Sequence, residues 1–293
     1  MKILIIGASG LVGSHLMKEL LSAGHEVTGT YRNYARPQLV KLDLERFEDF
    51  ERLMNDCLPE VVVHAAGWTW VDGCENDPER AFNENCGQPA RVAESCNKKG
   101  IRFLYYSTTY VFDGQDGPYL ESDPVSPINV YAKSKVAAEE QIASVTKGEA
   151  LIPRLICVWG KEAQKKNFVY QVIRAIEENK ELRVPRDQKG NPTWAGDIAY
   201  WSRRLIENRE KGIWNLCGSG ASMTRSEWLE EILGGLPREK VKWISDQWTY
   251  STYETVPGEQ AALRPLHAGG IQSKIQSRYP REVRLPSQLE ILF

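Results

Sequence analysis

The sequence predicts an α/β protein, a doubly wound parallel sheet with a smaller C-terminal lobe. In the first half of the chain, short runs rich in β-branched residues alternate with amphipathic stretches, the pattern of a parallel sheet flanked by helices. A glycine-rich turn follows the first of these runs and opens the first amphipathic stretch. At 293 residues, the chain is long enough for one nucleotide-binding domain with a companion lobe.

The first domain is expected over residues 1–157. Its strands are predicted near residues 2–6, 26–30, 39–42, 60–65 and 101–106, and a helix at 129–147 with a strand at 150–157 extends the same sheet. The remaining residues, 158–293, are expected to form the smaller lobe, with parts of 190–216 returning to the first domain. This lobe is predicted to hold helices near 167–178, 197–208 and 225–233, a strand at 182–184 and a loop-rich tail. Ligands of such folds bind at the carboxyl edge of the sheet, so the cleft between the two parts is the expected active site.

Composition favours a small-molecule partner in the cytoplasm. The chain carries 37 basic and 39 acidic residues, which argues against binding to nucleic acid or to an anionic membrane. Its six cysteines form no CxxC pair and no metal-ligand spacing, so reduced thiols and no metal site are expected. The apolar run Ile3–Ile6 stops at Gly7 and is interpreted as a strand rather than a signal peptide.

The glycine-rich turn has the spacing GxxGxxG and predicts a dinucleotide-binding loop. Gly7 permits a tight turn, Gly10 lets backbone approach a pyrophosphate, and Gly13 lets helix and strand pack closely. The helix that begins there offers N–H groups to the phosphates. The alternative is a glycine-rich turn that binds nothing. The expected cofactor residues of this loop are Gly7, Ser9, Gly10, Leu11, Val12 and Gly13.

The end of the second strand indicates the choice of cofactor. Arg32 stands there, and no Asp or Glu occurs from Val27 to Arg36, which suits the 2′-phosphate of NADPH better than an unmodified ribose. Neutral Thr30 leaves room for NADH as well. The alternative is an ordinary solvated arginine. Further along, Ala65, Ala66 and Gly67 end the fourth strand with small residues, where backbone passes close to the cofactor.

A proton-transfer site is predicted from Thr108, Tyr131 and Lys135. Tyr131 and Lys135 are spaced by four at the start of a helix, on one face, and Thr108 ends the fifth strand. Reduction of a ketone needs a proton donor and a hydrogen bond to the carbonyl oxygen. A nearby ammonium lowers the pKa of a tyrosine, so Lys135 is expected to activate Tyr131 and to hold the nicotinamide ribose. The alternative is a buried structural tyrosine.

Motifs along most of the chain resemble the extended short-chain dehydrogenases, which have a Rossmann fold, and within them the dTDP-4-dehydrorhamnose reductases. The motifs are GASGLVG at 7, HAAGWTWVDGCENDP at 64, FNEN at 82, STTYVFDG at 107, SPINVYAKSK at 126, KNF at 166, DQKGNPT at 187 and the pair Arg264-Pro265. The resemblance implies reduction of a 4-keto-6-deoxy sugar linked to a nucleoside diphosphate, with NADPH as donor. The resemblance is compatible with a homodimer but does not establish the oligomeric state.

The resemblance also implies roles for single residues. Asp43 and Leu44 border the adenine. Asp72 and Glu75 either shape the sugar pocket or cap the next helix. Positions that contact nucleotide or diphosphate in the family are occupied by Asn167, Gln188 and Arg264, and an arginine suits a phosphate fork.

Two departures from the family pattern border the expected sugar pocket. Thr109 stands where the family usually has Asp after the catalytic threonine, and Cys157 falls near a position that is often Trp. A different hexose or nucleotide is therefore compatible with the sequence, and Thr109 is counted among the substrate residues.

Two other functions remain open. Relatives that form GDP-fucose combine epimerisation with reduction and use a cysteine in the region that Tyr110 occupies here. The regulatory subunit of methionine adenosyltransferase has similar segments, including the run Ala35-Arg36-Pro37, and would make the chain a non-catalytic NADP-binding protein.

Overall fold

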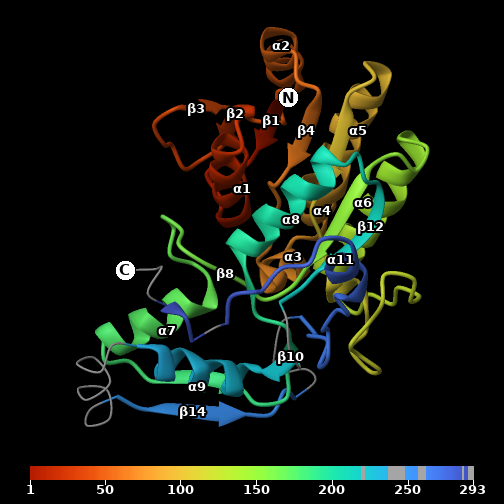
Figure 1. The fold of residues 1–293 in the computed structure, drawn as a ribbon. Coiled ribbons are helices and arrows are strands. Elements are labelled where there is room, and N and C mark those ends of the chain that lie inside the picture. The colour runs from red at the N-terminus through yellow and green to blue at the C-terminus, as the bar shows by residue number, and fades with distance from the viewer. Residues whose placement is uncertain (219–221, 237–247, 257–261, 286, 290–293) are drawn as a thin grey trace.

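The computed structural model describes residues 1–293 except 219–221, 237–247, 257–261, 286 and 290–293 (Figure 1). Its centre is an eight-stranded parallel sheet in the order β12-β7-β5-β4-β1-β2-β3, with β6 paired to β7. These strands are β1 (Lys2–Ile6), β2 (Glu26–Tyr31), β3 (Leu39–Lys41), β4 (Val61–His64), β5 (Arg102–Tyr105), β6 (Ser107–Thr108), β7 (Leu151–Leu155) and β12 (Gly212–Leu216).

Helices cover both faces of this sheet, because its central strands are apolar on both sides. Ile3 and Ile5 of β1 face a core shared with α1 (Leu11–Ser22), α8 (Ala195–Glu207) and α11 (Ser273–Arg278). Leu4 and Ile6 alternate to the other face, where they meet α2 (Phe47–Cys57), α5 (Gln88–Lys98) and α6 (Val130–Val145). Between β4 and α5 lie α3 (Val71–Asn76), α4 (Pro78–Phe82) and the π-helical turn η1 (Asn83–Gly87), and the 3₁₀ turn η2 (Thr109–Val111) follows β6.

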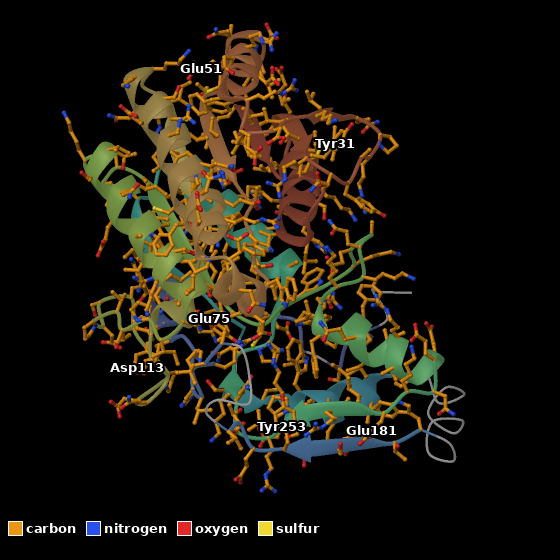
Figure 2. The ribbon with its side chains drawn as sticks, turned by 180° about the vertical axis from the view of Figure 1, so that it is seen from behind. Tyr31, Glu51, Glu75, Asp113, Glu181 and Tyr253 are labelled. Carbon is orange, nitrogen blue, oxygen red and sulfur yellow. The ribbon has the colours of Figure 1, made fainter. Side chains whose placement is uncertain are left out.

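The second lobe has a core of its own. It contains α7 (Phe168–Glu177), α9 (Arg225–Gly235) and the parallel pair β9 (Leu182–Pro185) and β14 (Tyr250–Tyr253). Two short pairs connect it to the rest, β8 (Val158–Trp159) with β11 (Thr193–Trp194) and β10 (Lys189–Gly190) with β13 (Met223–Thr224). Trp159, Trp228 and Trp248 pack in its interior. Figure 2 shows Glu181 and Tyr253 on this lobe, at the opposite end of the molecule from Glu51.

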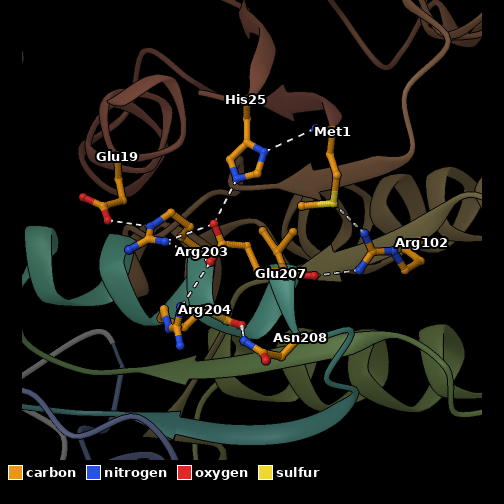
Figure 3. Close-up of polar contacts among 9 residues, drawn as sticks. Met1, Glu19, His25, Arg102, Arg203, Arg204, Glu207 and Asn208 are labelled. Carbon is orange, nitrogen blue, oxygen red and sulfur yellow. Dashed lines mark hydrogen bonds and ion pairs between the residues drawn. The ribbon is translucent and has the colours of Figure 1, made fainter. Parts of the chain in front are cut away.

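A polar network attaches α8 to the first domain (Figure 3). Arg203 on α8 donates to Glu19 on α1 at 2.8 Å, and Glu207 contacts His25 Nε2 at 3.1 Å. Arg102 on β5 donates to the carbonyl oxygen of Ile206 at 2.8 Å. Strand β12, which pairs with β7, adds the last strand to one edge of the sheet. Helix α8 adds to the layer of helices on one face, so residues far along the chain complete the first domain.

The expected strands and helices occur within a few residues of their predicted positions. The strand expected over 150–157 ends at Leu155, because Cys157 adopts the left-handed backbone conformation with φ 48° and turns the chain toward the second lobe. Strand β14 and helix α11 both lie in the tail that was expected to be rich in loops. In the part of the chain that the structure describes, no helix is long and apolar enough to cross a membrane and no cluster of metal-ligating side chains is found.

Candidate active site

Two of the three glycines in the glycine-rich loop are required by close packing within the protein. Gly7 has φ 86°, and a Cβ there would lie 2.8 Å from the backbone nitrogen of Ala66. A Cβ on Gly13 would lie 2.4 Å from the Gly7 carbonyl oxygen, so larger residues would separate helix α1 from the loop. At Gly10 the nearest protein atom would be 3.4 Å away. Gly10 is therefore not needed for protein packing, and its missing side chain leaves room for a ligand at the start of α1.

One cavity of about 930 Å³ runs from this loop to the second lobe. It lies at the carboxyl ends of the parallel strands, where such folds bind ligands. Its lining includes most of the predicted site residues: Gly10, Leu11, Val12, Ala65, Ala66, Gly67, Thr108, Tyr131, Lys135, Asn167, Gln188 and Arg264.

Thr108 and Tyr131 both line this cavity, and their side chains lie close enough to interact. Helix α6 begins one residue before Tyr131, because Asn129 accepts a hydrogen bond from the Ala132 N–H at 2.8 Å. Glu75 accepts another from the Val130 N–H at 3.0 Å. Glu75 therefore contacts the start of α6, which is not the next helix along the chain that it was expected to cap.

Burial is the largest cause of the pKa shifts of both Lys135 and Tyr131. The Lys135 ammonium donates to the Tyr106 carbonyl oxygen at 2.6 Å and lies 4.0 Å from the centre of the Tyr105 ring. Burial lowers the pKa of Lys135 to about 7, which Glu139 partly opposes. The pKa of Tyr131 is raised by burial and lowered only in part by Thr108. Desolvation therefore dominates over attraction between the two groups.

A buried ion pair includes Glu139, which lies about one helical turn after Lys135 on α6. Arg154 on β7 donates to Glu139 on α6 through Nε at 3.0 Å and Nη2 at 2.6 Å, and both side chains are at least nine-tenths buried. The Ser107 hydroxyl donates to the same carboxylate. These contacts fix α6 against β6 and β7, the elements that carry Tyr131, Lys135 and Thr108.

The residues expected at the nucleotide end are partly engaged with neighbours. Arg264 donates to Asp72 at 2.7 Å, which holds the C-terminal segment against α3. Asn167 donates to Gly160 and Glu162, but its buried Oδ1 has no partner among the residues that the structure describes. Gln188 donates to the Thr255 hydroxyl at 2.9 Å.

Thr109 does not border the cavity. Its side chain is fully buried and is absent from the lining, because the 3₁₀ turn that begins there directs it toward Gly270. Its predicted contact with substrate is wrong for this structure. The other departure from the family pattern, Cys157, does line the cavity.

Arg225 is a cavity residue that sequence reasoning missed. Its guanidinium lies over the rings of Phe168 and Trp228, at 5.1 and 4.9 Å from their centres, which are themselves 4.9 Å apart. Tyr110 lies close enough to interact with it. Among the described residues it has no carboxylate partner. A signal was present in the sequence: the capping box Thr224-x-x-Glu227 starts helix α9 at Arg225, and a cation in a first helical turn is unfavourable.

The expected adenine-ribose residues lie in a separate hollow of about 550 Å³. Arg32 and Asp43 both line it. Leu44 does not, because its apolar side chain is buried in the core covered by α2. Ser9, which is part of the loop between β1 and α1, is partly exposed and borders neither space.

A doubly wound sheet with a glycine-rich loop and a Tyr-Lys pair above its carboxyl edge defines the extended short-chain dehydrogenase class. Within it, the chain belongs to the RmlD substrate-binding domain family, whose model matches residues 1–267.

The chain is similar to two known proteins and to one solved structure. The chain is 39% identical to dTDP-4-dehydrorhamnose reductase of Burkholderia thailandensis over 68% of this chain but only 63% of that protein, less than two thirds of its length. It is 30% identical to methionine adenosyltransferase 2 subunit beta of Rattus norvegicus over 84% of this chain and 75% of that protein. Its fold matches the structure of dTDP-4-dehydrorhamnose reductase from Bacillus anthracis in complex with NADP, with a TM-score of 0.85, 24% identity and coverage of 100% and 98%.

Proposed function

We propose that the protein reduces the C4 ketone of a 4-keto-6-deoxy sugar linked to a nucleoside diphosphate, with NADPH as donor and NADH also accepted. One observation carries the proposal: Thr108, Tyr131 and Lys135 line the same cavity as the glycine-rich loop. A proton donor and a dinucleotide loop in one space are what a ketone reduction needs.

The nicotinamide supplies a hydride to C4 when it is bound. The chain's own residues do the rest. The Thr108 hydroxyl holds the ketone oxygen, and the Tyr131 hydroxyl gives its proton to that oxygen as the C4–H bond forms, so the ketone becomes an alcohol. Because burial keeps the pKa of Tyr131 high, the hydroxyl is protonated at neutral pH, as a proton donor must be. Lys135 binds the ribose and offers a positive charge to the phenolate that remains.

The second lobe provides a site for the nucleotide. Phe168, Trp228 and Tyr253 line the cavity there and offer aromatic surface to a base. Arg225 lacks a carboxylate partner among the described residues, so an oxyanion of the substrate would supply its counter-charge.

The proposal is tested by measuring NADPH oxidation with 4-keto-6-deoxy sugars linked to dTDP, UDP, GDP and CDP. We expect turnover with at least one of them, and NMR of the product gives the stereochemistry at C4. Inversion at a second carbon would identify the epimerising alternative, in which Tyr110 would take part. Binding of NADPH without turnover of any keto-sugar would contradict reduction.

A regulatory role is the second candidate. It is supported by the 30% identity to the rat methionine adenosyltransferase subunit. This role requires neither Tyr131 nor Lys135 to react, so turnover of a keto-sugar nucleotide that depends on both residues would exclude a purely regulatory function.

Lys135→Ala is expected to lower turnover and to weaken cofactor binding, each by about tenfold or more, because a charge-assisted hydrogen bond to the ribose is lost. The matched control is Lys133→Ala, two residues away and exposed on the same helix. Fluorescence titration and steady-state kinetics of both variants make the comparison. An unchanged affinity for NADPH in Lys135→Ala would remove the ribose contact from the proposal.

Arg225→Met is expected to raise KM for the sugar nucleotide by about tenfold to a hundredfold, the size of a charge-assisted contact, and to leave the Kd of NADPH within about threefold. Arg264→Ala should act in the same direction but less strongly, since Asp72 already pairs with that side chain. Arg174→Met on the exposed side of α7 serves as control. Equal losses for substrate and NADPH would place these arginines outside the substrate site.

A further inference from the structure

The adenine-ribose hollow contains a carboxylate that strand β2 does not supply. Arg32 Nη2 donates to Glu84 Oε2 at 3.1 Å, and Arg80 Nε donates to the other oxygen of Glu84 at 2.8 Å. Glu84 comes from the π-helical turn η1, and its side chain is only 9% exposed, against 35% for Arg32. The guanidinium expected to bind a 2′-phosphate therefore already has a counter-ion.

Glu84 is held in place from its other side. The Arg80 guanidinium lies 4.1 Å from the centre of the Trp68 ring, and the backbone N–H of Trp68 donates to Asn85 Oδ1 at 2.8 Å. Asn85 is the residue next to Glu84 and is itself buried. Because Arg80 and the buried turn both restrain Glu84, the carboxylate remains beside Arg32 when a ligand enters.

The charge of the hollow disfavours a phosphate. Five of the nine residues that line it are acidic, and only two, Arg32 and Arg80, are basic. A 2′-phosphate carries between about one and a half and two negative charges near pH 7, so it would compete with Glu84 for Arg32. A ribose 2′-hydroxyl would instead donate a hydrogen bond to a carboxylate, as in proteins that bind NAD.

We propose that Glu84 sets the choice of cofactor. By neutralising Arg32 and accepting a hydrogen bond from the 2′-hydroxyl of NADH, it removes most of the advantage of NADPH, so the two cofactors bind with affinities within about tenfold of each other. This inference rests on the proposed function, because it requires a nicotinamide dinucleotide in the cleft.

The test is a fluorescence titration of NADPH and of NADH at one ionic strength. Glu84→Gln keeps the size of the side chain and removes its charge, so the ratio of the Kd of NADH to that of NADPH should rise about tenfold or more. Glu79→Gln is the matched control: it removes a charge from the same hollow at an exposed position and should change the ratio less than threefold. Equal ratios in wild type and Glu84→Gln, or equal shifts in the two variants, would overturn the inference.

Arg32→Ala provides a second measurement that does not depend on the folding of Glu84→Gln. Because Glu84 neutralises Arg32, Arg32→Ala in the wild-type background should lower the affinity for NADPH less than threefold. A loss of tenfold or more would show that Arg32 is free to bind phosphate and would contradict the role of Glu84. In the Glu84→Gln background, Arg32→Ala should abolish the gained preference. If the wild-type protein binds neither cofactor, the proposed function itself fails, an outcome distinct from an unchanged ratio.

Discussion

Tyr131→Phe is expected to reduce kcat by about 10² to 10⁴ while cofactor affinity stays nearly constant, because the change removes only the hydroxyl that gives the proton. The Tyr131 ring packs near the Tyr110 ring, with 6.4 Å between their centres, and phenylalanine preserves this contact. Single-turnover kinetics with a keto-sugar nucleotide and titration of NADPH separate the two effects.

Tyr119→Phe is the control for the loss of a tyrosine hydroxyl. Tyr119 stacks on Phe112 and donates to Asp113 at 2.8 Å, outside the cavity lining, so this variant should turn over at the wild-type rate. If Tyr131→Phe turns over within threefold of wild type, Tyr131 is not the proton donor, and the nearby Thr108 hydroxyl becomes the next candidate.

The sheet was predictable from the sequence because each strand is a short apolar run with local turn signals. Strand β12 was harder to place. Its residues, Gly212–Leu216, follow a helix and carry no local signal that assigns them to a particular sheet. The pairing with β7 and the contacts of α8 with α1 place this strand in the main sheet.

The candidate site was predictable where one motif fixes both sequence and geometry, as in the glycine-rich loop and the Tyr131-Lys135 pair. It was not predictable where distant segments meet. The interval Val27 to Arg36 has no carboxylate, yet Glu84 reaches Arg32 from a turn that lies more than fifty residues later. The pKa of Lys135 depends on burial, which local spacing does not reveal.

Glu139→Ala is expected to lower the free energy of unfolding by about 3 to 5 kcal/mol, because it leaves the Arg154 guanidinium buried without its partner. Both side chains are almost fully buried, and the pair connects α6 to β7. The Ser107 hydroxyl also loses its acceptor. Urea unfolding followed by circular dichroism gives the change, and Glu94→Ala, in the exposed pair of Glu94 with Lys98, should cost at most about 1 kcal/mol.

A double variant distinguishes the cost of an unpaired buried charge from the cost of a lost contact. If the cost of Glu139→Ala comes from the uncompensated guanidinium, then Glu139→Leu combined with Arg154→Met should be more stable than Glu139→Leu alone, since apolar residues of similar size can replace a buried ion pair. Turnover of this double variant should not recover together with its stability. Glu139 raises the pKa of Lys135, so its loss favours the neutral form of that lysine. Recovery of both stability and turnover in the double variant would limit the ion pair to a structural role.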